Sequence, residues 1–139
     1  MQSFIKKSIE HVERIFDNVY NNKPRYRAYH FSIALERSKI IAVGLNNPIQ
    51  PSPKALGFAL QLGLTSKRTF PFIHSEEDVV SKLIGMDKLS SSLNIVVIRL
   101  NKYGLLGDSL PCESCQSVLK AYGLNNIWYS TKKGEILSL

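Results

Sequence analysis

Cysteine is scarce in this chain, and long apolar runs are absent. The 139 residues contain two cysteines, Cys112 and Cys115, which are too few for a framework of disulfide bonds. No stretch reaches the roughly 18 consecutive apolar residues that a membrane-spanning helix needs, so no membrane segment is expected. Residues 1–16 alternate apolar and charged side chains and lack the continuous apolar core of a secretory signal. We therefore expect a cytoplasmic protein with reduced cysteines.

Acidic residues are also in the minority. Lys and Arg number 18 against 11 Asp and Glu, which gives a net charge of +7. Such an excess attracts polyanions and phosphorylated small molecules, although a charge of this size also simply aids solubility. Tyr26 lies between Arg25 and Arg27, close to Lys23, and this mixture suits either stacking on a base with phosphate contacts or a solvated surface. Charge alone does not identify a partner.

No internal repeat or low-complexity tract divides the chain. Hydrophobic residues make up 44% of the sequence and charged residues 21%, which is the composition of a globular protein rather than a disordered one. A chain of this length buries a substantial core without disulfide bonds. We expect residues 1–139 to form one domain.

Hydrophobic periodicity predicts an alternation of helices and strands. Helices are expected at residues 3–20, 74–83 and 112–122, and strands at 29–35, 39–45, 93–100, 127–130 and 135–139. This order indicates an α/β fold in which helices pack on the faces of a layered sheet. Three prolines between residues 46 and 71 predict an irregular loop, with a short helix at 54–64, that covers or shapes the mouth of a site.

The most informative residues are His74, Glu76, Pro111, Cys112 and Cys115. They form the pattern H-x-E, a gap of 34 residues, and then P-C-x-x-C. Zinc favours imidazole and thiolate ligands, and a catalytic zinc site uses three protein ligands with a fourth position left open. The sequence therefore predicts a Zn²⁺ ion held by His74, Cys112 and Cys115.

These residues also allow two other interpretations, a structural zinc site and a redox pair. A closed structural zinc site needs a fourth protein ligand, and neither His11 nor His30 is an obvious one, because both are expected to be packed or on the surface. The C-x-x-C spacing also occurs in redox pairs. The neighbouring Pro111, the upstream H-x-E and the absence of a thioredoxin-like strand context favour a metal site.

The spacing of these residues suits hydrolytic chemistry. Cys112 and Cys115 are three apart on one expected helix, so both thiols reach the same metal, and the helix start favours the thiolate form. Zinc lowers the pKa of a water molecule that it binds to about 7. We expect Glu76 to carry that proton to the substrate ring nitrogen and then to the departing amine. Backbone N–H groups near Ser75 and Cys112 are expected to stabilise developing charge.

The same residues resemble the cytidine deaminase superfamily, over residues from about 29 to the end. The resemblance is carried by GLN at 44–46, HSE at 74–76 and PCESCQSVLKAYG from Pro111, and H-x-E with P-C-x-x-C is the signature of zinc deaminases that act on cytosine or adenine. It implies a three-layer α/β/α fold with a mixed five-stranded sheet, the same zinc ligands, and proton transfer by Glu76. It also implies substrate contacts from Asn46, Ser75 and Pro111, and assembly into a homo-oligomer.

The last two expected strands indicate which branch of the superfamily the chain resembles. Only residues 131–134 separate the last two expected strands, and so short a connection joins antiparallel strands. A C-terminal antiparallel hairpin is similar to the branch that holds cytidine deaminases and some RNA-editing cytosine deaminases. Two departures are visible: Ser75 stands where many members have Ala, and residues 47–73 lack the substrate motifs of the deoxycytidylate and transfer-RNA adenosine branches. The resemblance thus implies an activity but not a specificity.

The sequence predicts a zinc-dependent hydrolase that converts cytosine to uracil and releases ammonia. Its substrate is expected to be a cytosine-containing nucleoside, nucleotide or single-stranded nucleic acid. The sequence is also compatible with a free base as the substrate. One alternative is an adenine deaminase that acts on nucleic acid. Another is a non-catalytic, zinc-containing nucleic-acid-binding module, which the basic charge favours.

Overall fold

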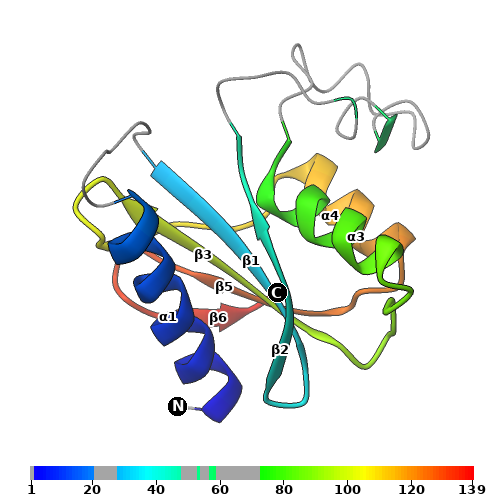
Figure 1. Ribbon diagram of the computed structural model, residues 1–139, viewed down its shortest axis with the longest axis horizontal. Helices are drawn as coiled ribbons and strands as arrows, with labels where there is room; N and C mark the ends of the chain where they lie inside the picture. The colour runs from blue at the N-terminus through cyan, green and yellow to red at the C-terminus, as the bar shows by residue number, and fades with distance from the viewer. Residues whose placement is uncertain (1, 21–27, 48–52, 54–56, 59–72) are drawn as a thin grey trace.

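The computed structural model describes residues 2–20, 28–47, 53, 57–58 and 73–139 (Figure 1). The described elements, in chain order, are α1 (Ser3–Ile15), a π-helical turn (Phe16–Tyr20), β1 (Ala28–Glu36), β2 (Lys39–Leu45), α3 (Ser75–Gly85), β3 (Asn94–Asn101), β4 (Leu106–Gly107), α4 (Glu113–Ala121), β5 (Asn126–Ser130) and β6 (Ile136–Ser138). Within these ranges, none of the helices combines the length and the apolar character that crossing a membrane requires.

The strands form one mixed sheet in the order β2-β1-β3-β5-β6. β3 and β5 run parallel, whereas β1 pairs antiparallel with both β2 and β3. The α/β fold class and the five expected strands are confirmed. A sixth strand, β4, pairs with the end of β3 and was not expected, because two residues are too short to give a periodic signal.

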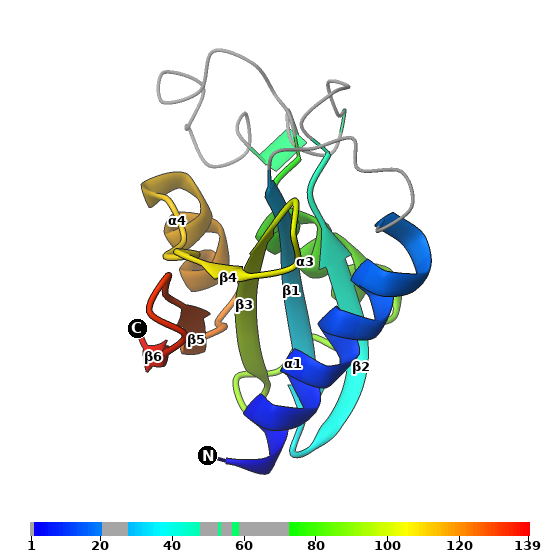
Figure 2. The same ribbon diagram turned by 90° about the vertical axis from the view of Figure 1, so that its left-hand side faces the viewer.

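The helices cover both faces of the sheet, which confirms the three layers. Figure 2 shows α1 in front of the sheet and α3 behind it. The side chains of β1 alternate between the faces: Phe31 and Ile33 belong to the core under α1, whereas Ala34 belongs to the core under α3 and α4. This alternation is the two-residue period of a strand that is buried on both faces.

The predicted C-terminal hairpin is also confirmed. β5 pairs antiparallel with β6, with Tyr129 opposite Leu137. The turn closes through a hydrogen bond from the Thr131 N–H to the Glu135 carbonyl at 2.9 Å, and Gly134 has φ 80°, a left-handed conformation that glycine adopts without strain. The basic cluster around Tyr26 lies outside the described residues. The same holds for most of the loop that was expected to shape the site mouth, with its expected helix at 54–64.

Candidate metal centre

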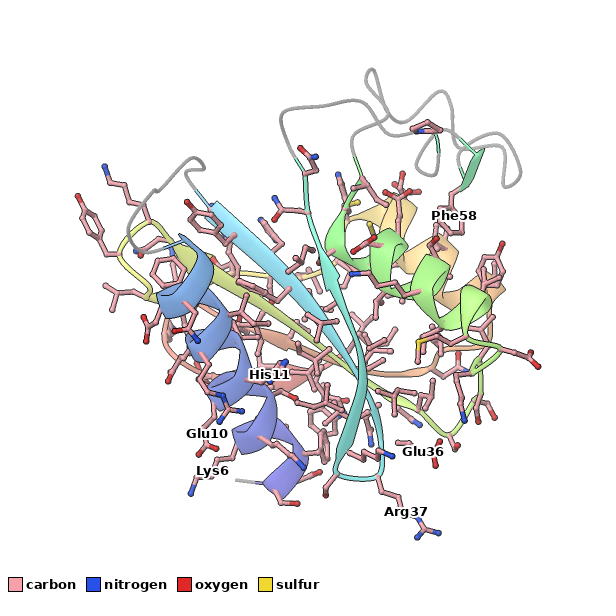
Figure 3. The ribbon with its side chains drawn as sticks, viewed as in Figure 1. Lys6, Glu10, His11, Glu36, Arg37 and Phe58 are labelled. Carbon is pink, nitrogen blue, oxygen red and sulfur yellow. The ribbon has the colours of Figure 1, made fainter. Side chains whose placement is uncertain are left out.

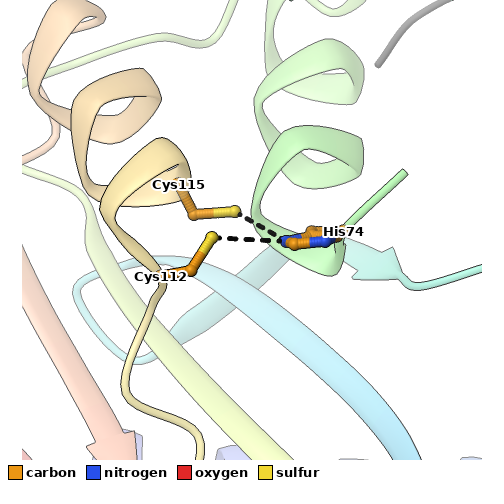
Figure 4. A group of neighbouring side chains, drawn as sticks. All are labelled: His74, Cys112 and Cys115. Atoms are coloured by element: carbon orange, nitrogen blue, oxygen red, sulfur yellow. Dashed lines mark hydrogen bonds between the residues drawn. The ribbon is translucent and has the colours of Figure 1, made fainter. Parts of the chain in front are cut away.

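The predicted metal ligands lie at the starts of two neighbouring helices. His74 is the N-cap residue of α3 and Cys112 is the N-cap residue of α4, both with extended backbone. Cys115 lies in the first turn of α4, on the side that faces His74 (Figure 4). Because α3 and α4 pack against the same face of the sheet, segments far apart in sequence meet there (Figure 1).

The three ligand atoms are close enough to share one ion. His74 Nδ1 lies 3.1 Å from Cys115 Sγ and 3.6 Å from Cys112 Sγ, and all three donor atoms lie within 4.8 Å of one another (Figure 4). Nitrogen and sulfur donors at two corners of a tetrahedral zinc site are about 3.6 Å apart. The donor set and its spacing therefore fit zinc, and the three residues predicted as ligands are brought together.

The two thiols differ in their environments. Cys115 is buried, whereas Cys112 is exposed at the helix start. A hydrogen bond from Cys115 lowers the pKa of the Cys112 thiol to about 3, although burial opposes this shift. The same contact, together with burial, raises the pKa of the Cys115 thiol. Both shifts favour the thiolate form at Cys112 over that at Cys115.

A buried carboxylate fixes the backbone of His74. Glu77 Oε1 accepts a hydrogen bond from the His74 N–H at 3.0 Å, and the Glu77 side chain is only 1% exposed. This contact is the backbone half of a capping box, which stabilises the first turn of a helix. Sequence reasoning did not assign Glu77 this role, although its position three residues after the N-cap is the signal that identifies a capping box.

Glu76 lies beside the three ligands without belonging to them. Its carboxylate is nearly buried, at 5% exposure, and Ser75 Oγ donates a hydrogen bond to Glu76 Oε1 at 3.0 Å. Since the one Ser75 hydroxyl proton points to Glu76, the Ser32 hydroxyl is the donor in the 2.8 Å contact between Ser32 and Ser75. Burial raises the pKa of Glu76, against the opposing effects of its backbone N–H, His74 and Ser75.

A cavity of about 310 Å³ adjoins the metal ligands. This volume lies at the lower end of the range for small-molecule sites. Its described lining includes His74, Ser75, Glu76 and Cys112, with His30, Asn46, Ile73, Ser109 and Leu110 around them. Among the residues predicted to contact substrate, Asn46 and Ser75 line the cavity. Pro111 is buried next to it and is not part of the described lining.

Asn46 extends the β1–β2 hairpin into the cavity. Its Oδ1 accepts a hydrogen bond from the His30 N–H at 2.9 Å, and its own N–H donates to the His30 carbonyl at 3.3 Å. These contacts orient the amide so that Nδ2 is left as a donor, with no acceptor among the described residues. An asparagine at this strand end is therefore held in place by β1.

His30 belongs to the cavity wall, which differs from its expected place on the surface or in the core. It is half-buried, and burial, with the nearby charge of Arg99 and His74, lowers its pKa to about 4, so the imidazole is neutral near pH 7. The signal was in the strand alternation: His30 shares a face with Ser32 and Ala34, opposite the large apolar side chains, and that face carries the site.

Ser109 fixes the other wall of the cavity. Its hydroxyl donates to the Val97 carbonyl at 2.6 Å and accepts the Ser130 N–H at 2.7 Å. Ser130 Oγ in turn lies 2.8 Å from the Gly107 carbonyl. These buried contacts tie the segment that leads to Cys112 to the middle of β3 and to the end of β5. Residues 102–110 carry no hydrophobic period, so sequence reasoning did not identify Ser109 and Leu110 as site residues.

The fold and the site together define a class: a three-layer α/β protein with a cytidine deaminase-like fold and a His-Cys-Cys group that fits a metal ion. The chain is similar to the crystal structure of cytidine deaminase from Mycobacterium leprae, with a TM-score of 0.50 and 16% sequence identity, over 94% of this chain and 88% of that chain. No family model and no curated protein matches the sequence. At this identity the likeness shows the fold.

The ligand set predicts how zinc content responds to substitution. Wild-type protein should carry one zinc per chain, and Cys115→Ala and His74→Ala should each reduce that content several-fold, because two protein ligands hold zinc weakly. Elemental analysis of dialysed protein checks this. Ser117→Ala is the matched control on α4, since the one hydrogen bond of Ser117 Oγ among the described residues goes to the Glu113 carbonyl within the same helix. Full zinc content in Cys115→Ala would contradict the assignment.

Proposed function

We propose that the protein is a zinc-dependent hydrolase that converts cytosine to uracil in a nucleoside, nucleotide or polynucleotide and releases ammonia. One observation carries the proposal: a nearly buried carboxylate, Glu76, lines the same cavity as two of the three residues that could hold zinc. An acid placed next to a three-ligand metal group is the arrangement that hydrolytic proton transfer requires.

The ligand count supports a catalytic rather than a structural role. Structural zinc sites are closed by four protein ligands. Within the part of the chain that the structure describes, only His74, Cys112 and Cys115 form a group that could hold a metal ion. Cys112 also lines the cavity, so the metal position faces the space that a substrate would enter. This disfavours a zinc ion that only holds the fold together.

The chain's own residues supply proton transfer and orientation. Zinc, when bound, lowers the pKa of water and makes hydroxide available near neutral pH. Glu76 would take a proton from the attacking water and deliver it to N3 of the cytosine ring, next to the amino-bearing carbon. Burial raises the pKa of Glu76, which favours a carboxyl that both accepts and returns a proton. Asn46 Nδ2 is oriented to donate a hydrogen bond to an oxygen of the substrate.

The reaction balances with water alone. The water oxygen forms a bond to C4 of cytosine, and one proton goes to N3. The second proton goes to the exocyclic amine through Glu76, the bond between C4 and that amine breaks, and ammonia leaves. The carbonyl that forms at C4 completes uracil. No oxidant or second substrate is needed.

A substrate panel tests the proposed function. Zinc-loaded protein is incubated with cytidine, deoxycytidine, their 5′-monophosphates, and single-stranded DNA and RNA that contain cytosine, with adenine counterparts in parallel. We expect uracil and ammonia in equal amounts from at least one cytosine substrate and neither product from the adenine series. Ammonia from the adenine series alone would replace the assignment by adenine deamination. No ammonia from any cytosine substrate would overturn it.

A further inference from the structure

An arginine whose guanidinium has no partner among the described residues lies next to the cavity. Arg99 on β3 is the register partner of His30 on β1. Cross-strand partners point to the same face of a sheet, about 5 Å apart, so Arg99 shares the face of the metal centre, one strand beyond the cavity wall. The effect of Arg99 on the pKa of His30 agrees with this proximity.

The guanidinium of Arg99 has no counterion among the described residues. Its backbone N–H donates to Ser130 Oγ at 3.1 Å, but no side-chain hydrogen bond or ion pair satisfies its five N–H donors within the described ranges. The neighbouring acid, Asp108, instead accepts the Lys132 N–H at 2.9 Å. A half-buried arginine whose guanidinium has no acceptor among the described residues is available to bind an external anion.

The stem of Arg99 lies over Gly107 on the neighbouring strand β4. A Cβ at Gly107 would lie 3.3 Å from Arg99 Cδ and 3.4 Å from Cγ, so the missing side chain at Gly107 leaves room for the stem along β4. An arginine whose stem packs against backbone loses less freedom when its head binds a ligand. The planar guanidinium can donate two parallel hydrogen bonds to two oxygens of one phosphate.

We propose that Arg99, together with His30, binds a phosphate ester of the substrate, so that the protein acts on phosphorylated cytosine compounds in preference to free nucleosides. This proposal rests on the proposed function. The cytosine ring carries no negative charge, so the anion that Arg99 accepts belongs to the sugar-phosphate part of the substrate. His30 lies in the cavity wall, on the strand between Asn46 and Arg99, and its neutral imidazole donates a hydrogen bond to the same phosphate.

The test compares substrates with and without phosphate. For wild-type protein we expect kcat/KM for deoxycytidine 5′-monophosphate, cytidine 5′-monophosphate or a cytosine-containing oligonucleotide to exceed that for the matching nucleoside by about 10- to 100-fold, the effect of one charged hydrogen-bonding pair. Arg99→Gln should reduce this ratio by a similar factor, and Arg99→Lys should give an intermediate value. The mononucleotide and oligonucleotide arms distinguish a free nucleotide from a polymer as the phosphate source.

The control removes the same charge at the opposite end of the sheet. Arg37 lies in the exposed turn between β1 and β2 (Figure 3), and Arg37→Gln should leave the ratio of the two kcat/KM values unchanged. Equal kcat/KM for nucleoside and nucleotide in the wild type would overturn the proposal. An Arg99→Gln variant in which kcat/KM falls equally for every substrate would also overturn it. So would an Arg37→Gln variant in which the nucleotide-to-nucleoside ratio falls as much as in Arg99→Gln.

A binding measurement separates this proposal from the proposed function. Equilibrium dialysis of cytidine and cytidine 5′-monophosphate against zinc-loaded Glu76→Gln, with and without Arg99→Gln, needs no turnover. We expect the monophosphate to bind about 10- to 100-fold more tightly than cytidine and to lose that advantage with Arg99→Gln. If no substrate is deaminated but this preference is found, the deaminase assignment fails and the phosphate site stands. Equal affinity for the two compounds would overturn the phosphate site alone.

Discussion

Replacing Glu76 with glutamine is expected to lower kcat for cytosine deamination by about 10²- to 10⁴-fold, the usual contribution of a general acid-base group. The amide has nearly the same shape and still accepts the hydrogen bond from Ser75 Oγ, which is 3.0 Å from Glu76 Oε1 in the wild type. It cannot take up and return a proton. Uracil formation, zinc content and Tm, measured on the same preparation, give the result.

Two comparisons make the Glu76→Gln result specific. Zinc content should stay at one per chain, because Glu76 is not among the residues that could hold the ion. Glu10→Gln on the exposed side of α1 removes the same charge far from the site and should leave kcat unchanged (Figure 3). A Glu76→Gln variant that keeps zinc and retains more than about a tenth of the wild-type kcat would contradict the proton-transfer role.

Gly44→Ala is expected to destabilise the protein by about 3 kcal/mol and to reduce zinc content, because overpacking against backbone cannot be relieved by a side-chain movement. A Cβ at Gly44 would overlap the Ser75 carbonyl oxygen and lie 2.6 Å from the Val79 N. Both atoms belong to the first turns of α3. The helix would have to move away from β2, and His74 and Glu76 would move with it. Urea denaturation and elemental analysis measure the two effects.

Gly85→Ala is the matched control for this change. Gly85 is also on α3, and a Cβ there meets no atom of the described ranges within 4 Å. Alanine also has the higher helix propensity, so this variant should be as stable as the wild type or slightly more stable. If Gly44→Ala unfolds at the same urea concentration as Gly85→Ala and keeps its zinc, β2 does not hold α3 in the way the structure indicates.

The elements that could be predicted from the sequence are those with a clear hydrophobic period. β1 is an example: Tyr29, Phe31 and Ile33 alternate with smaller or polar residues, and the strand forms there. β4 could not be predicted, because its two residues are too few to show a period. They form a strand only because the preceding turn brings them beside β3. Helix starts were predicted to within about a residue, since Cys112 and His74 are the N-cap residues rather than the first helical ones.

The metal ligands could be predicted because their chemistry is visible in residue type and spacing. The residues of the cavity wall could not be predicted in this way, because their place depends on which strand ends lie beside the starts of α3 and α4. His30 shows the difference: in sequence it is one polar residue in an alternating strand, and only the pairing of β1 with β2 and β3 sets it between Asn46 and Arg99. Ser109 likewise acquires its role through hydrogen bonds to two other strands.

X-ray absorption at the zinc edge of wild-type protein tests the metal centre most directly. We predict one zinc per chain with two sulfur donors and one imidazole nitrogen from the protein, the set that His74, Cys112 and Cys115 supply. Protein that binds no zinc, or a spectrum that requires a third sulfur or a second imidazole, would contradict an open, hydrolytic site.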